Sequence, residues 1–274
     1  MGHRRYVAEF AFLGFTMVVA VLGFWDLYFG PRAEPQPHHH LHLATTYAWM
    51  ALLAAQLVLL SRGKWAQHRQ LGLAVLIAGP LLAASAALLT VHSARRGLAS
   101  GEGDFLLINN VVGTVFLCLV LWLAFRLRKE RKVHGAFLMS SLILFQGPAI
   151  FFSMMSFVPA FQTPKPDTFQ QIGMIGLATQ TILVGAMFLR DRRNNWPYLF
   201  VFIGSFVGVE VARAVLTRLN AMDAALRLVA TPTEMGIFFF TLAVMLAALG
   251  ALVWPSRRLG AADRAARAGK TIIT

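Results

Sequence analysis

The stretch from His40 to Gly72, HLHLATTYAWMALLAAQLVLLSRGKWAQHRQLG, contains a membrane helix, a short basic loop and the start of a second helix. An apolar run of about 20 residues is long enough to cross the hydrocarbon core of a bilayer. Most polar and aromatic side chains of the first helix recur at helical spacing on one stripe. That stripe holds His42, Thr46, Trp49, Leu53 and Gln56, and His68 opens the next helix.

The rest of the chain repeats this pattern of apolar runs and short charged connectors. Of its 274 residues, 57% are hydrophobic and 14% are charged, whereas a soluble domain is about half apolar and a quarter charged. We therefore predict an all-α integral membrane protein, a single transmembrane domain over 1–274, in which about eight helices include a central four-helix bundle. The predicted spans are 7–29, 41–60, 68–92, 105–126, 134–157, 168–189, 197–216 and 233–254.

The basic residues set the expected orientation and partners. The net charge is +13, but the charges lie in connectors between apolar runs, which argues against nucleic acid and for membrane lipid as the surrounding partner. Alternate connectors are the richer in Lys and Arg, so both termini are expected to be cytoplasmic. The richer set contains Arg4, Arg5, Arg62, Lys64, Arg69, Arg126, Arg128, Lys129, Arg131, Lys132, Arg190, Arg192, Arg193, Arg257 and Arg258.

His68 and His134 are the first candidate cofactor-binding residues. Each opens a predicted helix directly after a basic loop, so the two imidazoles are expected at a similar depth. Helices two apart in an antiparallel bundle can face each other diagonally, and two imidazoles across that diagonal can ligate a haem iron. Arg69 and Arg131 would neutralise the haem propionates, and Gly72 removes side-chain bulk. The alternative is that these residues anchor helix ends at the lipid headgroups.

A second group of histidines lies toward the opposite membrane face. His42 and His92 are on neighbouring predicted helices, which pack too closely, at about 8–10 Å, to hold a porphyrin between them. A metal ion, a quinone hydrogen bond or a proton-transfer site fits better. His40 belongs to the preceding histidine run, which is of a kind that binds copper, zinc or nickel. The open alternatives are a polar helix interface and a solvated loop.

Glu210 and Arg213 form the third polar feature, because charged residues inside a span are costly and often functional. Their i, i+3 spacing allows them to pair with each other. Gly204 and Gly208 form a GxxxG motif, which is typical of close helix contacts. The sequence has no Walker motif, dinucleotide fingerprint, HExxH or GxSxG, which argues against a nucleotide-driven transporter or a membrane hydrolase.

Several of these residues together resemble a known group of proteins. The pattern is His40-x-His42, Trp49, Gln56, His68-Arg69-x-x-Gly72, then His134, Met139 and Gly147-Pro148-Ala149. It is similar to a group of uncharacterised bacterial multi-pass membrane proteins, itself distantly similar to the cytochrome b561 superfamily. The resemblance implies a protein of the bacterial inner (plasma) membrane. It also implies a bundle with a haem b held by His68 and His134, which shuttles electrons from a quinol or ascorbate. It departs at the other face, where 105–126 has no histidine to pair with His42.

The first functional hypothesis is therefore a membrane-embedded haem b protein that transfers electrons, with quinol or a redox protein as partner. The second is a non-catalytic anchoring subunit of a larger membrane complex. The third is a metal or small-molecule transporter that uses His42, His92 and the Glu210–Arg213 region.

Overall fold

The computed structural model describes the backbone of residues 6–100, 104–163, 165 and 167–270, with side chains to Val253 except those of 104–106. The described part is helical and contains no strand, which confirms the predicted fold class. The elements are α1 (Val7–Gly23), η2 (Trp25–Phe29), α2 (Pro37–Ser61), α3 (Trp65–Gly72), α4 (Val75–Ser100), α5 (Asp104–Arg126), α6 (Arg131–Ser140), α7 (Ile143–Phe157), α8 (Pro159–Gln162), α9 (Thr168–Arg190), α10 (Trp196–Arg218), α11 (Met222–Ala230) and α12 (Glu234–Lys270).

Seven helical segments of the described chain are long and apolar enough to cross a membrane. These are 37–61, 75–100, 107–126, 131–157, 168–190, 196–218 and 234–253. The remaining predicted span, 7–29, corresponds to α1, which has 17 residues and is about 26 Å long. The π-helical turn η2 follows it. The protein is thus a multi-pass helical membrane protein.

Two of the predicted spans are interrupted near their first turns. The run 68–92 is divided between α3 and α4, and the run 134–157 between α6 and α7. At both breaks the backbone uses i→i+3 bonds, for example Leu76 N to Leu73 O at 3.1 Å and Leu144 N to Ser141 O at 3.2 Å. In each case a proline, Pro80 or Pro148, follows within the first two turns of the next helix.

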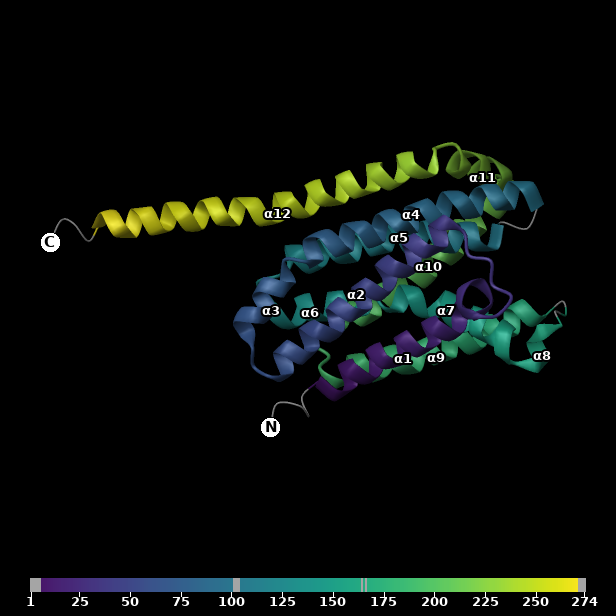
Figure 1. Cartoon of the computed structure of the whole chain (residues 1–274), viewed down its shortest axis with the longest axis horizontal. Helices are drawn as coiled ribbons and strands as arrows, with labels where there is room; N and C mark the ends of the chain where they lie inside the picture. The colour runs from purple at the N-terminus through teal and green to yellow at the C-terminus, as the bar shows by residue number, and fades with distance from the viewer. Residues whose placement is uncertain (1–5, 101–103, 164, 166, 271–274) are drawn as a thin grey trace.

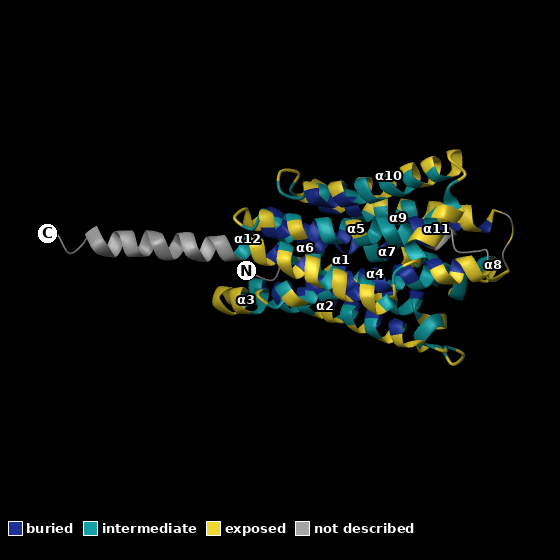
Figure 2. Cartoon of the chain, turned by 90° about the horizontal axis from the view of Figure 1, so that it is seen from above, coloured by how far each residue is buried: buried dark blue, intermediate teal, exposed yellow. Residues whose placement is uncertain are grey.

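The core lies where α2, α4, α5 and the α6–α7 pair meet. Its largest fully buried side chains include Trp49, Leu82, Leu121 and Phe137. Gly79 lets α4 approach closely, because a Cβ there would lie 3.2 Å from a methyl group of Leu121. Buried residues line the inner faces of the helices and exposed residues the outer ones (Figure 2). This is the central four-helix bundle that the sequence predicts.

The GxxxG motif of α10 makes the helix contact expected of it. A Cβ on Gly204 would lie 2.7 Å from the Phe116 ring, and one on Gly208 would lie 3.1 Å from Val112. Both neighbours are on α5, so the small residues accommodate large α5 side chains.

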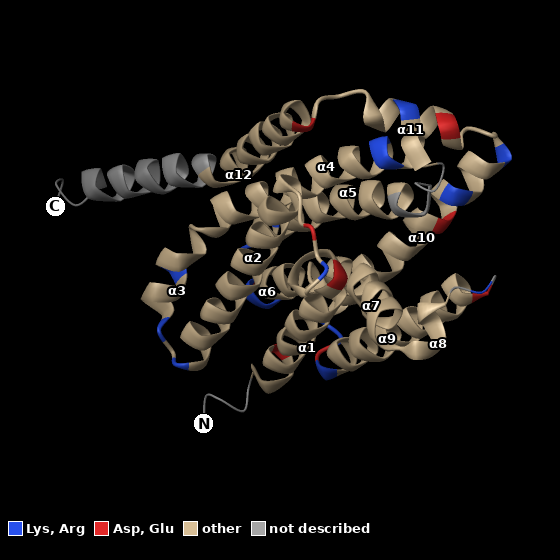
Figure 3. Ribbon diagram, turned by 45° about the vertical axis from the view of Figure 1, so that its right-hand side comes forward, with Lys and Arg blue, Asp and Glu red and all other residues tan. Residues whose placement is uncertain are grey.

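The charged residues are concentrated near helix ends and connections (Figure 3). α12 runs beside α4 and continues well beyond the other helices (Figure 1). Its first residue, Glu234, lies near His92 and Arg95, toward the C-terminal end of α4. The side chains of Arg4, Arg5, Arg257 and Arg258, which contribute to the predicted orientation, lie outside the described residues.

Candidate functional sites at the two ends of the bundle

The polar stripe of α2 faces the interior of the bundle, and its members bond to different helices. Trp49 Nε1 donates to Ser141 Oγ at 3.0 Å, while His42 Nδ1 lies 3.2 Å from Ser85 Oγ. Gln56 contacts His68 on α3. His42, Trp49 and Gln56 are all buried. The stripe therefore joins two clusters of histidines, one near each end of α2.

His68 is held by the Gln56 amide. In the orientation that satisfies both neighbours, the amide oxygen accepts from Gly72 N–H at 2.8 Å and the amide nitrogen donates to His68 Nδ1. His68 is half-buried, and burial followed by the nearby charge of His134 lowers its pKa below the ordinary value. The imidazole is consequently neutral at pH 7, with its proton on Nε2 in this arrangement.

His134 is oriented by a backbone carbonyl. Its Nδ1–H donates to Ala124 O at 2.7 Å, and the Phe125 ring meets the imidazole edge-on at a centroid distance of 5.9 Å. A hydrogen bond from Nδ1–H fixes the tautomer in which Nε2 carries the lone pair. This is the arrangement that metal-ligating histidines commonly adopt.

Two glycines lie close to the histidines in sequence, Gly135 next to His134 and Gly72 one turn after His68. A Cβ built on Gly135, next to His134, would meet no atom within 4 Å, and one on Gly72 would meet only the Gln56 amide, at 3.7 Å. Arg69 and Arg131 are exposed at this end of the bundle. The small residues and the cations are thus on the side where haem ligation is predicted.

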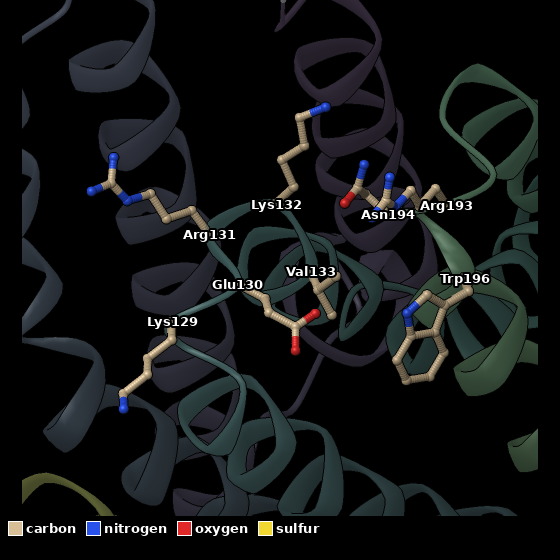
Figure 4. Close-up of a pocket in the computed structure, with 8 residues that line it drawn as sticks. All are labelled: Lys129, Glu130, Arg131, Lys132, Val133, Arg193, Asn194 and Trp196. Carbon is tan, nitrogen blue, oxygen red and sulfur yellow. The ribbon is translucent and has the colours of Figure 1, made fainter.

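Arg131 also lines a basic pocket of about 580 Å³. Figure 4 shows the pocket between the α5–α6 and α9–α10 connections, with Arg131 projecting away from Arg193 and Trp196. Lys132, another lining residue, forms an ion pair with Asp191 at 2.9 Å. The Lys132 hydrogen bond lowers the pKa of the Asp191 carboxyl. Neither His68 nor His134 lines this pocket.

At the other end of the bundle, His92 meets His38 and Glu234. The His38 and His92 ring centroids are 3.7 Å apart, and His92 Nδ1 is 3.5 Å from Glu234 Oε1. One ligand atom from each of the three residues lies within 4.8 Å of the other two. In the part of the chain that the structure describes, this is the group with metal-ligand geometry.

The other predicted metal residues are separated from this group. His40 Nδ1 bonds to the Tyr28 hydroxyl at 2.8 Å, and His42 bonds to Ser85 as described above. The structure therefore brings together His92 and His38, which belongs to the histidine run noted in the sequence, with Glu234, which the sequence analysis did not single out. A sequence signal for His38 exists, because it precedes His42 by four residues and shares its helix face.

Glu234 could not be assigned to the cluster from the sequence. Its position at the start of α12, against α4, depends on how α12 packs, and no local spacing connects it to His38 or His92. Comparisons add no further assignment, since the chain matches no protein-family model, no curated protein and no solved structure.

Proposed function

We propose that this multi-pass protein binds one b-type haem between His68 and His134 and transfers electrons in the membrane. The observation that carries the proposal is the hydrogen bond from His134 Nδ1–H to Ala124 O. It leaves Nε2 with the lone pair that an iron ligand needs. The resemblance of the His68-Arg69-x-x-Gly72 and His134 regions to the cytochrome b561 superfamily supports the same pair of ligands.

The surroundings of both imidazoles fit this cofactor. Gly135 and Gly72 add no side-chain bulk near the two imidazoles. The lowered pKa of His68 keeps its imidazole neutral, which is the form that binds iron. Arg69 and Arg131 supply positive charge for the propionates. Bound haem would supply a one-electron couple, which the polar and apolar residues around it would tune.

Gln56 has a specific part in this proposal. Its amide nitrogen donates to His68 Nδ1, whereas iron ligation through Nε2 requires a proton on Nδ1. The amide would then turn so that its oxygen accepts from Nδ1–H, with loss of the Gly72 N–H bond. We therefore assign Gln56 the role of orienting His68.

The protein would hold one haem, and a quinol that binds and dissociates would reduce it. On the other side of the bundle, α5 carries no histidine that could pair with His42. The termini and basic loops are proposed to face the cytoplasm of a bacterial cell, which places His68 and His134 on the cytoplasmic side.

Haem content per chain tests this proposal. The full chain, expressed with added haem precursor and purified in detergent, should contain about one b-type haem per polypeptide. His68→Ala and His134→Ala should each abolish it, while His40→Ala, which removes an exposed imidazole, should retain it. Full haem content in both ligand variants would contradict the proposal.

One observation favours a second candidate, an anchoring subunit of a larger complex. Glu210 and Arg213 pair at 3.9 Å on α10, and their side chains are 52% and 45% exposed. An ion pair on an exposed face within a span is costly in lipid, and a partner subunit could cover it. Co-purification of a stoichiometric partner that is lost in Glu210→Ala would support this role, and an isolated chain in mild detergent would count against it.

A further inference from the structure

We infer that His38, His92 and Glu234 form a binding site for one divalent transition-metal ion of the zinc class. The site lies at the opposite end of α2 from Gln56 and His68; His38 and Gln56 are separated by 18 residues of helix, or about 27 Å. It is independent of the proposed haem site and shares no residue with it.

The first argument is an unsatisfied ligand atom. His38 is 8% exposed, and its Nε2 is buried without a hydrogen-bond partner among the described residues. A buried imidazole nitrogen without a partner costs about 1–3 kcal/mol. A metal ion would satisfy this atom, since a neutral imidazole nitrogen is among the commonest metal ligands.

The second argument is the distance between the ligand atoms. They lie within 4.8 Å of one another, whereas ligand atoms around a tetrahedral zinc ion are about 3.3 Å apart, for bonds of about 2.0 Å. The required closure is at most about 1.5 Å, which side-chain rotation can provide. His92 and Glu234 are 30% and 32% exposed, so an ion can reach the buried His38 through them.

The third argument is that two of the three helix positions, those of His38 and Glu234, are held in place. His38 follows Pro37 at the start of α2, where Gln36 and His39 form a reciprocal capping box. Arg95 fastens the segment before Glu234 by donating to Pro232 O at 2.7 Å and to Ala230 O at 3.2 Å. Ligands fixed by their helices lose little freedom when they bind an ion.

The chemical nature of the three ligand atoms determines which metal ions the site should prefer. Two imidazole nitrogens and one carboxylate oxygen suit Zn²⁺ and its neighbours Co²⁺, Ni²⁺ and Cu²⁺, whereas Ca²⁺ and Mg²⁺ prefer all-oxygen sites and Cu⁺ prefers sulfur. Three protein ligands leave a fourth position for water or another ligand, as in exchangeable zinc sites. Arg95 Nη1, 4.0 Å from Glu234 Oε1, opposes the ion's charge and should moderate the affinity.

Calorimetric titration of ZnCl₂ into the full chain in detergent tests this site. The protein must be purified without a polyhistidine tag. We expect one ion per chain, and an affinity lowered at least 100-fold in His38→Ala, His92→Ala and Glu234→Gln, since even second-shell changes cost about 10- to 100-fold. His40→Ala, from the same histidine run but bonded to Tyr28, should bind as the unaltered chain does.

Glu234→Gln decides the outcome if a histidine variant does not fold, because it keeps the size and shape of the side chain. Without metal it should unfold at the same temperature as the unaltered chain, and added ZnCl₂ should no longer stabilise it. An unaltered chain that binds no Zn²⁺ at about 1 mM, which corresponds to about −4 kcal/mol, would overturn the inference. Equal loss in His40→Ala, or undiminished binding in Glu234→Gln, would also overturn it.

Discussion

Histidines cluster at both ends of the bundle, but the hydrogen bonding of their ring nitrogens differs between the two ends. At one end, Gln56 and Ala124 O bond to Nδ1 of His68 and His134, and Gly135 adds no side-chain bulk near His134. At the other end, His38 Nε2 has no hydrogen-bond partner among the described residues, and the imidazoles contact each other directly. Oriented imidazoles that lie near glycines suit a large planar cofactor, whereas imidazoles in contact suit a single ion.

The largest expected effect is that a substitution at one end of the bundle abolishes binding of haem or of Zn²⁺ at that end only. His134→Ala should remove all haem and leave Zn²⁺ affinity unchanged, while His38→Ala should do the reverse. The reason is that the clusters share no residue and lie about 27 Å apart along α2. Haem absorbance and zinc calorimetry on both variants measure this. Loss of both ligands in either variant, with the fold intact, would remove the distinction between the two ends.

The variant Gln56→Leu tests whether Gln56 orients His68. It leaves His68 Nδ1 and Gly72 N–H without the amide, at a cost of about 1–3 kcal/mol for a buried unpaired group. The unfolding temperature without haem should therefore fall. In the haem-loaded chain, a changed midpoint potential would reveal the orienting role, because a purely structural residue would alter stability alone. An unaltered potential would refute that role.

Ser85→Ala probes the stripe between the two ends. Ser85 Oγ contacts His42 Nδ1 at 3.2 Å and Thr45 Oγ1 at 2.7 Å, so its removal should cost about 0.5–1.5 kcal/mol of stability. Thermal unfolding measures this change. Haem content and Zn²⁺ affinity should both persist; loss of Zn²⁺ binding would mean that the metal site includes His42, as the sequence predicts, rather than His38.

The smallest effect is a pH dependence at the His68 end. The folded state lowers the pKa of His68 below 6.5. As the pH falls through that value, the unfolded chain therefore binds more protons than the folded chain does. Stability should therefore decline on acidification below about pH 6.5, and His68→Gln should flatten the decline. Denaturant unfolding of the haem-free chain at several pH values checks this. A steeper decline in His68→Gln would contradict the lowered pKa.

The sequence predicted the helices and the buried polar stripe because both follow from local periodicity. Trp49, Gln56 and His42 face the interior as their spacing requires. The helix breaks before Pro80 and Pro148 were harder to predict, because a proline in a membrane helix is compatible with either a kink or a change of helix. As a result, His68 and His134 lie in the short helices α3 and α6 that precede the breaks.

The composition of the cluster of His38, His92 and Glu234 could not be predicted from the sequence. His92 was identified from its position, but its partners depend on the packing of α12 against α4, which brings Glu234 from a distant part of the chain. His38 was hidden within a run that looked like a solvated loop, whereas it is the second residue of α2. Long-range packing, rather than local propensity, decides such sites.

The measurement that tests the proposed function most directly is the optical spectrum of the detergent-purified chain, oxidised and then reduced with a water-soluble quinol. We predict a sharp b-type band at about one haem per chain, which appears on addition of quinol and is absent from His134→Ala. A chain that carries no haem after expression with adequate supply, or a haem band that persists in His134→Ala, would contradict the proposal.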